Sequence, residues 1–251
     1  MDSEFDRLVA EASAADVDGW DFGWLRGRAT EERPPWGYSR VMAERLAQAE
    51  RALDLATGGG EVLNEAPTFP PVMVATESWP PNLSKAAELL APRGVNVVAA
   101  HWPGPLPFDA ETFDLVVARH PVGVRWSEIS RVLAQGGHYV AQHVGPASAV
   151  EVTEWFLGPQ PGAFGNRTPQ AARDGATKAG LTVVNLRSRR LRMEFFDVGA
   201  VVYFLRKVIW IVPGFTVDDH VPALEAMHRH IQRRGSFVAH SARMLIETVK
   251  R

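Results

Sequence analysis

The sequence contains no cysteine, and this absence excludes several kinds of chemistry at once. Disulfide bonds, thiolate zinc sites, iron–sulfur clusters and a cysteine nucleophile all need a thiol that the chain does not have. An excess of one charge is also missing, because 27 basic and 29 acidic residues leave a formal net charge of −2. No global basic field therefore attracts the protein to nucleic acid or to an anionic membrane.

Long hydrophobic runs are absent as well. No segment approaches the roughly 20 apolar residues of a membrane span, and the run from Val198 to Val212 is also too short. The amino terminus is acidic and polar, without the basic region and apolar stretch of a secretory signal. We therefore expect a cytoplasmic protein with no membrane partner.

A glycine-rich turn is the most informative feature that is present. The segment Leu53 to Leu63 reads LDLATGGGEVL, so an apolar strand runs directly into three consecutive glycines. Bare backbone at such a turn lets a ligand come close. Nineteen residues after Gly58, a second apolar run ends at Glu77, an acid placed to accept the ribose hydroxyls of an adenosine. The two signals together predict a nucleotide-binding turn.

Apolar runs separated by helical patterns continue along the chain of 251 residues, 46% of them hydrophobic. Strands are expected at Ala52 to Ala56, Pro71 to Glu77, Val95 to Ala100, Phe113 to Ala118, His138 to His143, Leu181 to Leu186 and within Phe237 to Val249. Continuous apolar runs are typical of a sheet covered by helices on both faces. The pattern predicts an α/β fold with a doubly wound, mostly parallel seven-stranded sheet.

The order of strand, glycine loop, acid, FDLVVA and the AQGG turn resembles the class I S-adenosylmethionine-dependent methyltransferases, and in particular their type 11/25-like members. The match covers roughly Ala52 to His143. It implies a Rossmann-like fold, S-adenosyl-L-methionine as cofactor, and a backbone cradle around Ala56 to Gly58 for the methionine part. Glu77 would hold the ribose.

The resemblance implies cofactor contacts from Asp54, Ala56, Thr57, Gly58, Gly60, Glu77, Trp79, His101, Trp102 and Arg119. After the third strand the family commonly has an acid that contacts the adenine amino group, whereas this chain has His101 and Trp102. We therefore expect adenine recognition through backbone groups, with Trp102 or Trp79 as the stacking surface.

His120, directly after the expected fourth strand, is the candidate catalytic residue. It would act as a general base if the acceptor were a hydroxyl or ammonium group, or it would only bond to the backbone where the strand turns. Its neighbour Arg119 would pair with an acidic substrate or with a surface carboxylate. The chain has Arg119-His120-Pro121-Val122 where amide and exocyclic-nitrogen methyltransferases often have Asn- or Asp-Pro-Pro-aromatic, which disfavours DNA bases as substrates.

An irregular segment rich in aromatic residues precedes the first expected strand. Candidate substrate residues in it are Trp24, Arg28, Trp36 and Tyr38. Such rings either form a lid over a pocket or cap the hydrophobic core.

The aromatic segment ends where the first expected strand begins, and this sets the expected domain boundary. We expect amino-terminal helices and an aromatic lid over residues 1–51, and a cofactor-binding domain over 52–251 that includes a helical insertion at about 195–235.

These patterns favour a methyltransferase that acts on a small molecule, at oxygen or a carboxylate. An RNA methyltransferase is the second hypothesis, based on the basic run Arg187, Arg189, Arg190 and Arg192. A nicotinamide-dependent oxidoreductase is the third, although Leu63 stands where G-x-G-x-x-G needs its last glycine. An inactive ligand-binding homologue is the fourth. Because the histidines lack spacing that places two of them on one face, we expect no metal site.

Overall fold

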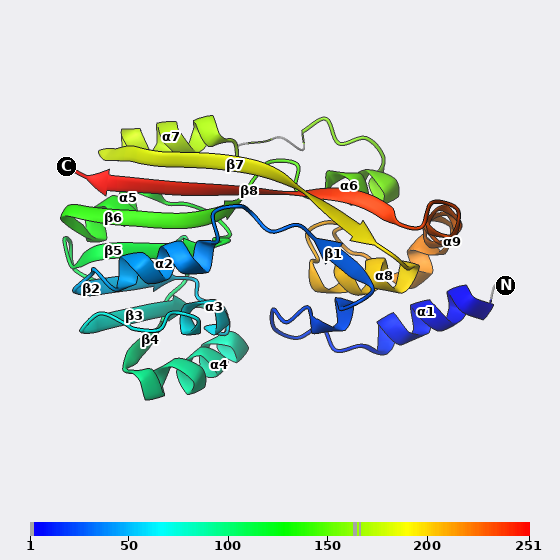
Figure 1. The fold of residues 1–251 in the computed structure, drawn as a ribbon, viewed down its shortest axis with the longest axis horizontal. Coiled ribbons are helices and arrows are strands. Elements are labelled where there is room, and N and C mark those ends of the chain that lie inside the picture. Colours follow the sequence, from blue (N-terminus) through cyan, green and yellow to red (C-terminus); the bar gives the residue numbers. More distant parts are fainter. Residues whose placement is uncertain (1–2, 163–164, 166) are drawn as a thin grey trace. The chain divides into compact units, whose positions relative to one another are not determined.

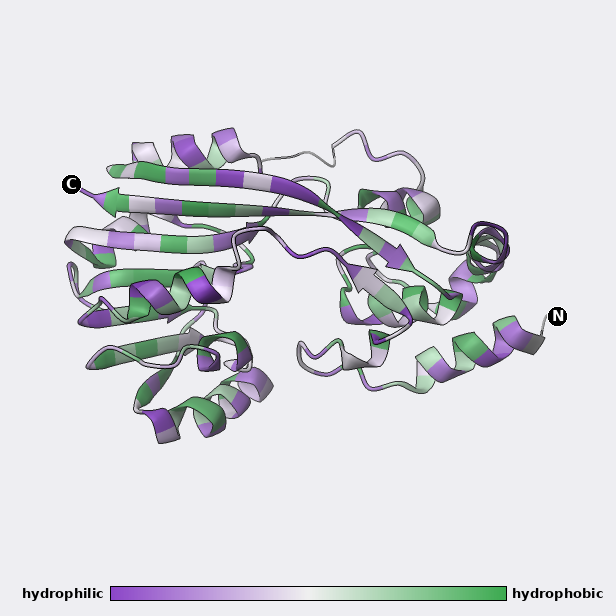
Figure 2. Ribbon diagram, viewed as in Figure 1, coloured by the Kyte–Doolittle hydropathy of each residue, from purple (hydrophilic) through white to green (hydrophobic). Residues whose placement is uncertain are grey.

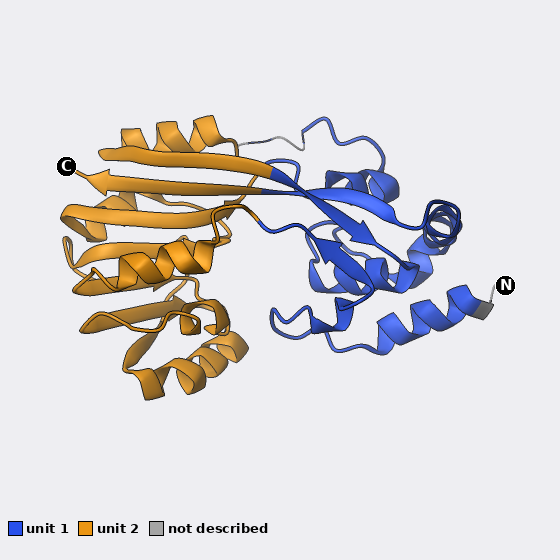
Figure 3. Ribbon diagram, in the orientation of Figure 1, with its two compact units in different colours: residues 1–33, 146–165, 190–242 blue, residues 34–145, 166–189, 243–251 orange. Residues whose placement is uncertain are grey.

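The computed structural model describes residues 3–162, 165 and 167–251. These residues form two compact units, which Figure 3 shows in different colours. Unit 1 combines residues 1–33, 146–165 and 190–242, and unit 2 combines residues 34–145, 166–189 and 243–251. The expected boundary between an amino-terminal segment of helices and lid (1–51) and a cofactor-binding domain (52–251) stays a prediction.

The elements carry the labels of Figure 1. The strands are β1 (Ala29–Glu31), β2 (Arg51–Leu55), β3 (Val72–Glu77), β4 (Val95–Ala99), β5 (Phe113–Arg119), β6 (Leu133–Val144), β7 (Leu181–Phe195) and β8 (Phe237–Lys250). The α-helices are α1 (Ser3–Ala14), α2 (Tyr38–Leu46), α3 (Glu61–Asn64), α4 (Pro80–Leu90), α5 (Trp126–Val132), α6 (Val150–Leu157), α7 (Pro169–Lys178), α8 (Val198–Lys207) and α9 (Val217–Arg234). Two 3-10 turns, η1 (Gly23–Leu25) and η2 (Ala91–Arg93), complete the list.

The strands follow the order β1-β7-β8-β6-β5-β2-β3-β4 in one sheet. The pairs from β4 to β6 are parallel, whereas β8 runs antiparallel to β6 and β1 antiparallel to β7. The α/β class and the doubly wound parallel core are confirmed. The expected number of seven strands is wrong, because the described residues form eight. The sheet is also mixed, since its parallel strands continue into antiparallel ones. Strand β1 has only three residues, too few to produce a detectable period, and it lies in the segment expected to be a lid.

Alternating side chains of the strands in unit 2 face two separate hydrophobic clusters. Leu53, Leu55 and Val116 face the cluster that α5 and α7 cover. Ala52 and Leu115 face the other cluster, which α2, α3 and α4 cover. In Figure 2, β3 and β5 are largely hydrophobic while α2 and α4 mix hydrophobic and hydrophilic residues. Burial on both faces explains why these strands appear in the sequence as continuous apolar runs.

Unit 1 has its own core around α8, which packs closely against α1. The expected helical insertion at about 195–235 corresponds to α8 and α9. Asp197 is the N-cap of α8, as its position in the sequence predicts, and its carboxylate accepts a hydrogen bond from the Ala200 amide at 2.8 Å. Almost every residue of α8 is buried, which is why its apolar residues have no clear period.

Candidate functional site

The glycine loop joins β2 to α3 and is fastened to the end of β3. Ala56, Gly58 and Gly60 have positive φ angles of 53°, 67° and 85°. The Thr57 amide donates to the Thr76 carbonyl at 2.8 Å, and the Ala56 amide donates to the Thr76 hydroxyl at 3.2 Å. The left-handed conformation at Gly58 and Gly60 favours glycine. The expected cradle therefore has a defined backbone shape.

Gly60 is also required by its surroundings. A Cβ atom built on it would lie 2.8 Å from Cδ1 of Leu90, which is fully buried on α4. The loop and α4 are thus in close contact, and a larger residue would separate them.

Glu77 links the loop to the end of β3. One carboxylate oxygen accepts from the Gly58 amide at 2.9 Å, and the other accepts from the amides of Ser78 and Trp79 at 2.7 and 2.9 Å. The side chain is buried. The two elements that the sequence selects as cofactor contacts are therefore joined by a direct hydrogen bond.

Asp54 is the other buried carboxyl group at this edge of the sheet. Burial, opposed by a hydrogen bond with the Thr57 side chain and aided by the negative charge of Glu77, raises its pKa to about 7. Tyr38, the first residue of α2, is buried beside it. Burial and the proximity of Asp54 and Tyr139 hold the pKa of Tyr38 well above its usual value, against the opposing effect of Arg119. The structure thus brings Tyr38, Asp54 and Arg119 together.

Asn82, in the first turn of α4, has a buried side-chain oxygen with no hydrogen-bond partner among the residues that the structure describes. Buried polar atoms are normally satisfied, and an exception calls for an unseen partner.

His120 follows β5 with a positive φ of 54°. Its amide donates to the Gln142 carbonyl at 2.7 Å, and its Nε2 lies 2.9 Å from Nε2 of the Gln142 side chain. The Gln142 side-chain oxygen accepts from the Trp36 indole at 2.7 Å. Burial keeps the pKa of His120 well below its usual value, and the charges of Arg243, Arg119 and His143 act in the same direction. His120 is therefore a neutral imidazole at neutral pH.

The residues expected to recognise adenine differ in exposure. Trp79, the N-cap of α4, is 46% exposed, and His101 is exposed as well. Trp102 belongs to the core, and its indole donates to the Gly123 carbonyl at 2.7 Å. Trp79 is thus the more accessible of the two proposed stacking surfaces, although its role stays a prediction.

The four candidate substrate residues belong to different units. In unit 1, Trp24 stacks on Tyr203 with ring centroids 4.7 Å apart, and the Arg28 guanidinium lies 4.1 Å from the Trp24 ring. Arg28 also pairs with Asp197 at 2.8 Å. In unit 2, Trp36 and Tyr38 are both buried. Their proposed contacts with substrate stay predictions.

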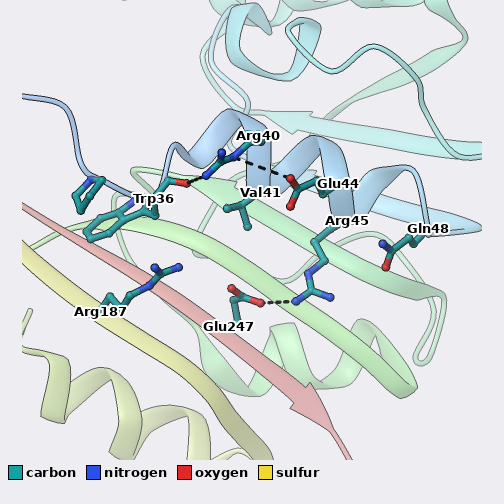
Figure 4. Close-up of a pocket in the computed structure, with 9 residues that line it drawn as sticks. Trp36, Arg40, Val41, Glu44, Arg45, Gln48, Arg187 and Glu247 are labelled. Carbon is teal, nitrogen blue, oxygen red and sulfur yellow. Dashed lines mark hydrogen bonds and ion pairs between the residues drawn. The ribbon is translucent and has the colours of Figure 1, made fainter.

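A cavity of about 470 Å³ lies beside α2 in unit 2 (Figure 4). Trp36 forms part of its wall, and the Arg187 guanidinium lies 5.9 Å from the indole ring. Farther along α2, Arg45 pairs with Glu247 at 2.7 Å. The cavity is thus lined by several charged side chains of both signs.

Gln142 is a site residue that sequence reasoning missed. It lies within β6, directly after the buried apolar residues Tyr139, Val140 and Ala141. A polar residue in such a strand is a signal that it needs a buried partner. Here it has two, Trp36 and His120, which lie far apart in the sequence.

The described residues contain no cluster of three potential metal ligands. Within the same residues, none of the helices combines the length and apolar character that a membrane span requires.

Comparison with known proteins finds one matching family model and many solved structures of similar fold. Residues 53–141 match the family model for a methyltransferase domain. No curated protein matches the chain in sequence. Among solved structures, a candidate methyltransferase from Bacillus halodurans is similar with a TM-score of 0.58 and 19% identity, covering 84% of this chain and 99% of that one.

Two further solved structures share the fold. A candidate sarcosine dimethylglycine methyltransferase from Galdieria sulphuraria has a TM-score of 0.51 and 14% identity, with 98% of each chain covered. A phosphoethanolamine N-methyltransferase from Haemonchus contortus, in complex with S-adenosylhomocysteine, has a TM-score of 0.51 and 14% identity, covering 86% of this chain and 52% of that one. Residues 53–141 are therefore similar to a methyltransferase domain, and the chain shares its fold with solved methyltransferase structures.

Proposed function

We propose that this protein is an S-adenosylmethionine-dependent methyltransferase that transfers a methyl group to an oxygen atom of a small molecule, including a carboxylate oxygen. The hydrogen bond between Glu77 and the Gly58 amide carries the proposal. It joins a glycine loop to an acid at the tip of the neighbouring parallel strand, where open α/β sheets bind nucleotides. The methyltransferase family match covers both residues.

The residues at this edge of the sheet suit the cofactor. The oxygens of Glu77 accept backbone hydrogen bonds and have lone pairs left for a ribose hydroxyl. The positive φ angles of Gly58 and Gly60 leave the loop backbone open to close approach.

The activated methyl group of the bound cofactor supplies the electrophile. The protein's main task is then to align the acceptor atom with that methyl group, and positioning alone lowers a barrier by several kcal/mol, up to about 10. His120, after β5, remains the candidate group that contacts the acceptor. Arg119 is exposed beside it and is available to an anionic substrate.

The two alternative activities receive less support. For RNA methylation, two of the arginines in the basic run are already paired, Arg190 with Glu151 at 2.7 Å and Arg192 with Glu194 at 2.9 Å. For a nicotinamide-dependent oxidoreductase, the typical strand order ends in three successive parallel strands. In this sheet the antiparallel β8 lies beside β6 instead. A cytoplasmic location stays part of the proposal.

Isothermal titration calorimetry with S-adenosylhomocysteine, NAD and NADP tests the cofactor without the acceptor. We expect micromolar binding of S-adenosylhomocysteine alone. Binding of a dinucleotide alone would favour the oxidoreductase. No binding of any of the three ligands would favour the inactive homologue.

A further inference from the structure

We propose that Trp36 and Gln142 are positioning residues that hold His120 as the tautomer protonated on Nδ1. His120 then donates a hydrogen bond to the methyl acceptor and does not remove a proton from it, so the acceptor is a carboxylate. The inference about the acceptor rests on the proposed function. The inference about the tautomer rests on geometry alone.

The first step fixes the orientation of the Gln142 amide. An indole N–H is only a donor, so the atom 2.7 Å from the Trp36 nitrogen must be the amide oxygen. Trp36 is only 2% exposed, so water does not compete for this bond. The Gln142 NH₂ group must therefore point the other way, toward His120.

The second step fixes the imidazole. The Gln142 NH₂ group is only a donor, and it lies 2.9 Å from His120 Nε2. Nε2 must accept this bond and cannot carry a proton itself. A neutral imidazole has one proton, which is then on Nδ1.

The third step concerns the charge state. The groups around His120 are the cations Arg119 and Arg243 and the buried His143, and burial together with these groups lowers the pKa of His120 well below its usual value. A second proton on the ring is thus disfavoured at neutral pH. With Nε2 occupied and Nδ1 protonated, the ring is a hydrogen-bond donor and has no free lone pair with which to act as a base.

The acceptor class follows from this donor role. A hydroxyl acceptor needs a base, and an amine uses its single lone pair for the attack. A carboxylate is ionised at neutral pH and has two oxygens, so one can accept the Nδ1 hydrogen bond while the other reacts. That oxygen forms the new O–CH₃ bond as the S–CH₃ bond breaks, with its electron pair left on sulfur, and no proton moves.

Long-range ¹H–¹⁵N NMR of the histidine-labelled full chain at pH 7.5 tests the tautomer directly, because protonated and unprotonated ring nitrogens have different shifts. His120→Gln assigns the signal. We expect Nδ1 of His120 to be protonated and Nε2 to be unprotonated. A protonated Nε2 in the wild-type protein would overturn both the tautomer and the acceptor class.

Two variants test the cause. Trp36→Phe removes the donor that orients the amide, and we expect the Nδ1–H signature to be replaced by a mixture of tautomers. Gln142→Glu provides only acceptors, so the proton should move to Nε2. Trp126→Phe is the matched control, because Trp126 packs against Tyr139 and His143 outside this chain of hydrogen bonds. An unchanged His120 signal in both Trp36→Phe and Gln142→Glu would contradict the positioning role.

Calorimetry with S-adenosylhomocysteine on the same samples separates the two proposals. If Nδ1 is protonated but the protein does not bind S-adenosylhomocysteine, the proposed function is wrong and the proposed tautomer is still correct. If the protein binds S-adenosylhomocysteine but Nε2 is protonated, the proposed function is supported and the proposed tautomer is wrong.

Discussion

Glu77 accepts a hydrogen bond from the amide of Gly58, 19 residues earlier in the chain, at 2.9 Å. This bond joins the end of β3 to the turn after β2, so the acid and the glycine loop are held together directly. Because the other Glu77 oxygen holds the amides of Ser78 and Trp79, the same carboxylate also shapes the start of α4.

Glu77→Gln should weaken the binding of S-adenosylhomocysteine. The glutamine NH₂ group would face at least one of the backbone amides that now donate to the carboxylate. Two donors would then oppose each other, and a charged acceptor would be lost. We expect a loss of about 1 to 3 kcal/mol in binding free energy, measured by calorimetry. Glu88→Gln, on the exposed face of α4, is the control and should bind normally. Equal affinities for the two variants would remove Glu77 from the site.

Gly60→Ala should destabilise the protein more than Gly94→Ala. Both glycines have positive φ angles, so either alanine adds a backbone strain of about 1 kcal/mol. Only at Gly60 would the new Cβ meet a buried side chain, at 2.8 Å from Leu90, whereas nothing lies within 4 Å at Gly94. Overpacking of this kind costs about 1 to 3 kcal/mol more. Urea denaturation of the two variants measures the difference, and equal losses would contradict the close contact.

Asp54→Asn should change how stability depends on pH. The pKa of Asp54 is about 7 in the folded protein against 3.8 for the ordinary carboxyl, so the folded state favours the protonated form. That contribution to stability is fully present below pH 3.8 and is lost as pH rises through about 7. Asparagine does not titrate. We therefore expect the variant to gain about 2 to 4 kcal/mol relative to wild type between pH 4 and pH 8.

Denaturation curves at pH 4, 6 and 8 for the wild type and Asp54→Asn check this expectation. Asp114→Asn is a useful contrast, since Asp114 is less buried and accepts hydrogen bonds from the amides of Glu50 and Arg51. A pH-independent difference between wild type and Asp54→Asn would show that Asp54 is already ionised at low pH in the folded protein.

Asp197→Ala should destabilise unit 1 more than Thr168→Ala destabilises unit 2. Each substitution removes an N-cap, which typically costs about 1 kcal/mol. Asp197 also pairs with Arg28 at 2.8 Å, and both side chains are about four-fifths buried. We expect a total loss of about 1 to 3 kcal/mol for Asp197→Ala. Hydrogen exchange of α8 and α7 reports each helix separately, and equal losses would mean that the ion pair contributes nothing.

The parallel core could be predicted from the sequence because β2, β3 and β5 are largely buried on both faces and therefore appear as continuous apolar runs. The strands from Ala52 to Ala118 lie close to their expected residues. The extent of β7 could not be predicted in the same way. It continues through the basic run to Phe195, and its exposed arginines interrupt the apolar pattern that marks a buried strand. Backbone pairing with β1 orders its end, and such pairing leaves no trace in composition.

The candidate site shows the same limit of local patterns. The relation between Gly58 and Glu77 could be inferred because both follow neighbouring strands. The contact of Gln142 with Trp36 spans 106 residues and depends on the path of the chain into α2. The position of His120 after β5 could therefore be predicted from the sequence, whereas its tautomer could not.

The place of β8 in the sheet has a consequence for synthesis of the chain. β8 lies between β6 and β7, yet it follows both in the sequence (Figure 1). Until residues 237–250 leave the ribosome, β6 and β7 have no strand between them, and each presents an unpaired edge. Open edges of this kind invite pairing with other chains. The nascent protein should therefore depend most on chaperones in the interval between synthesis of β7 and synthesis of β8.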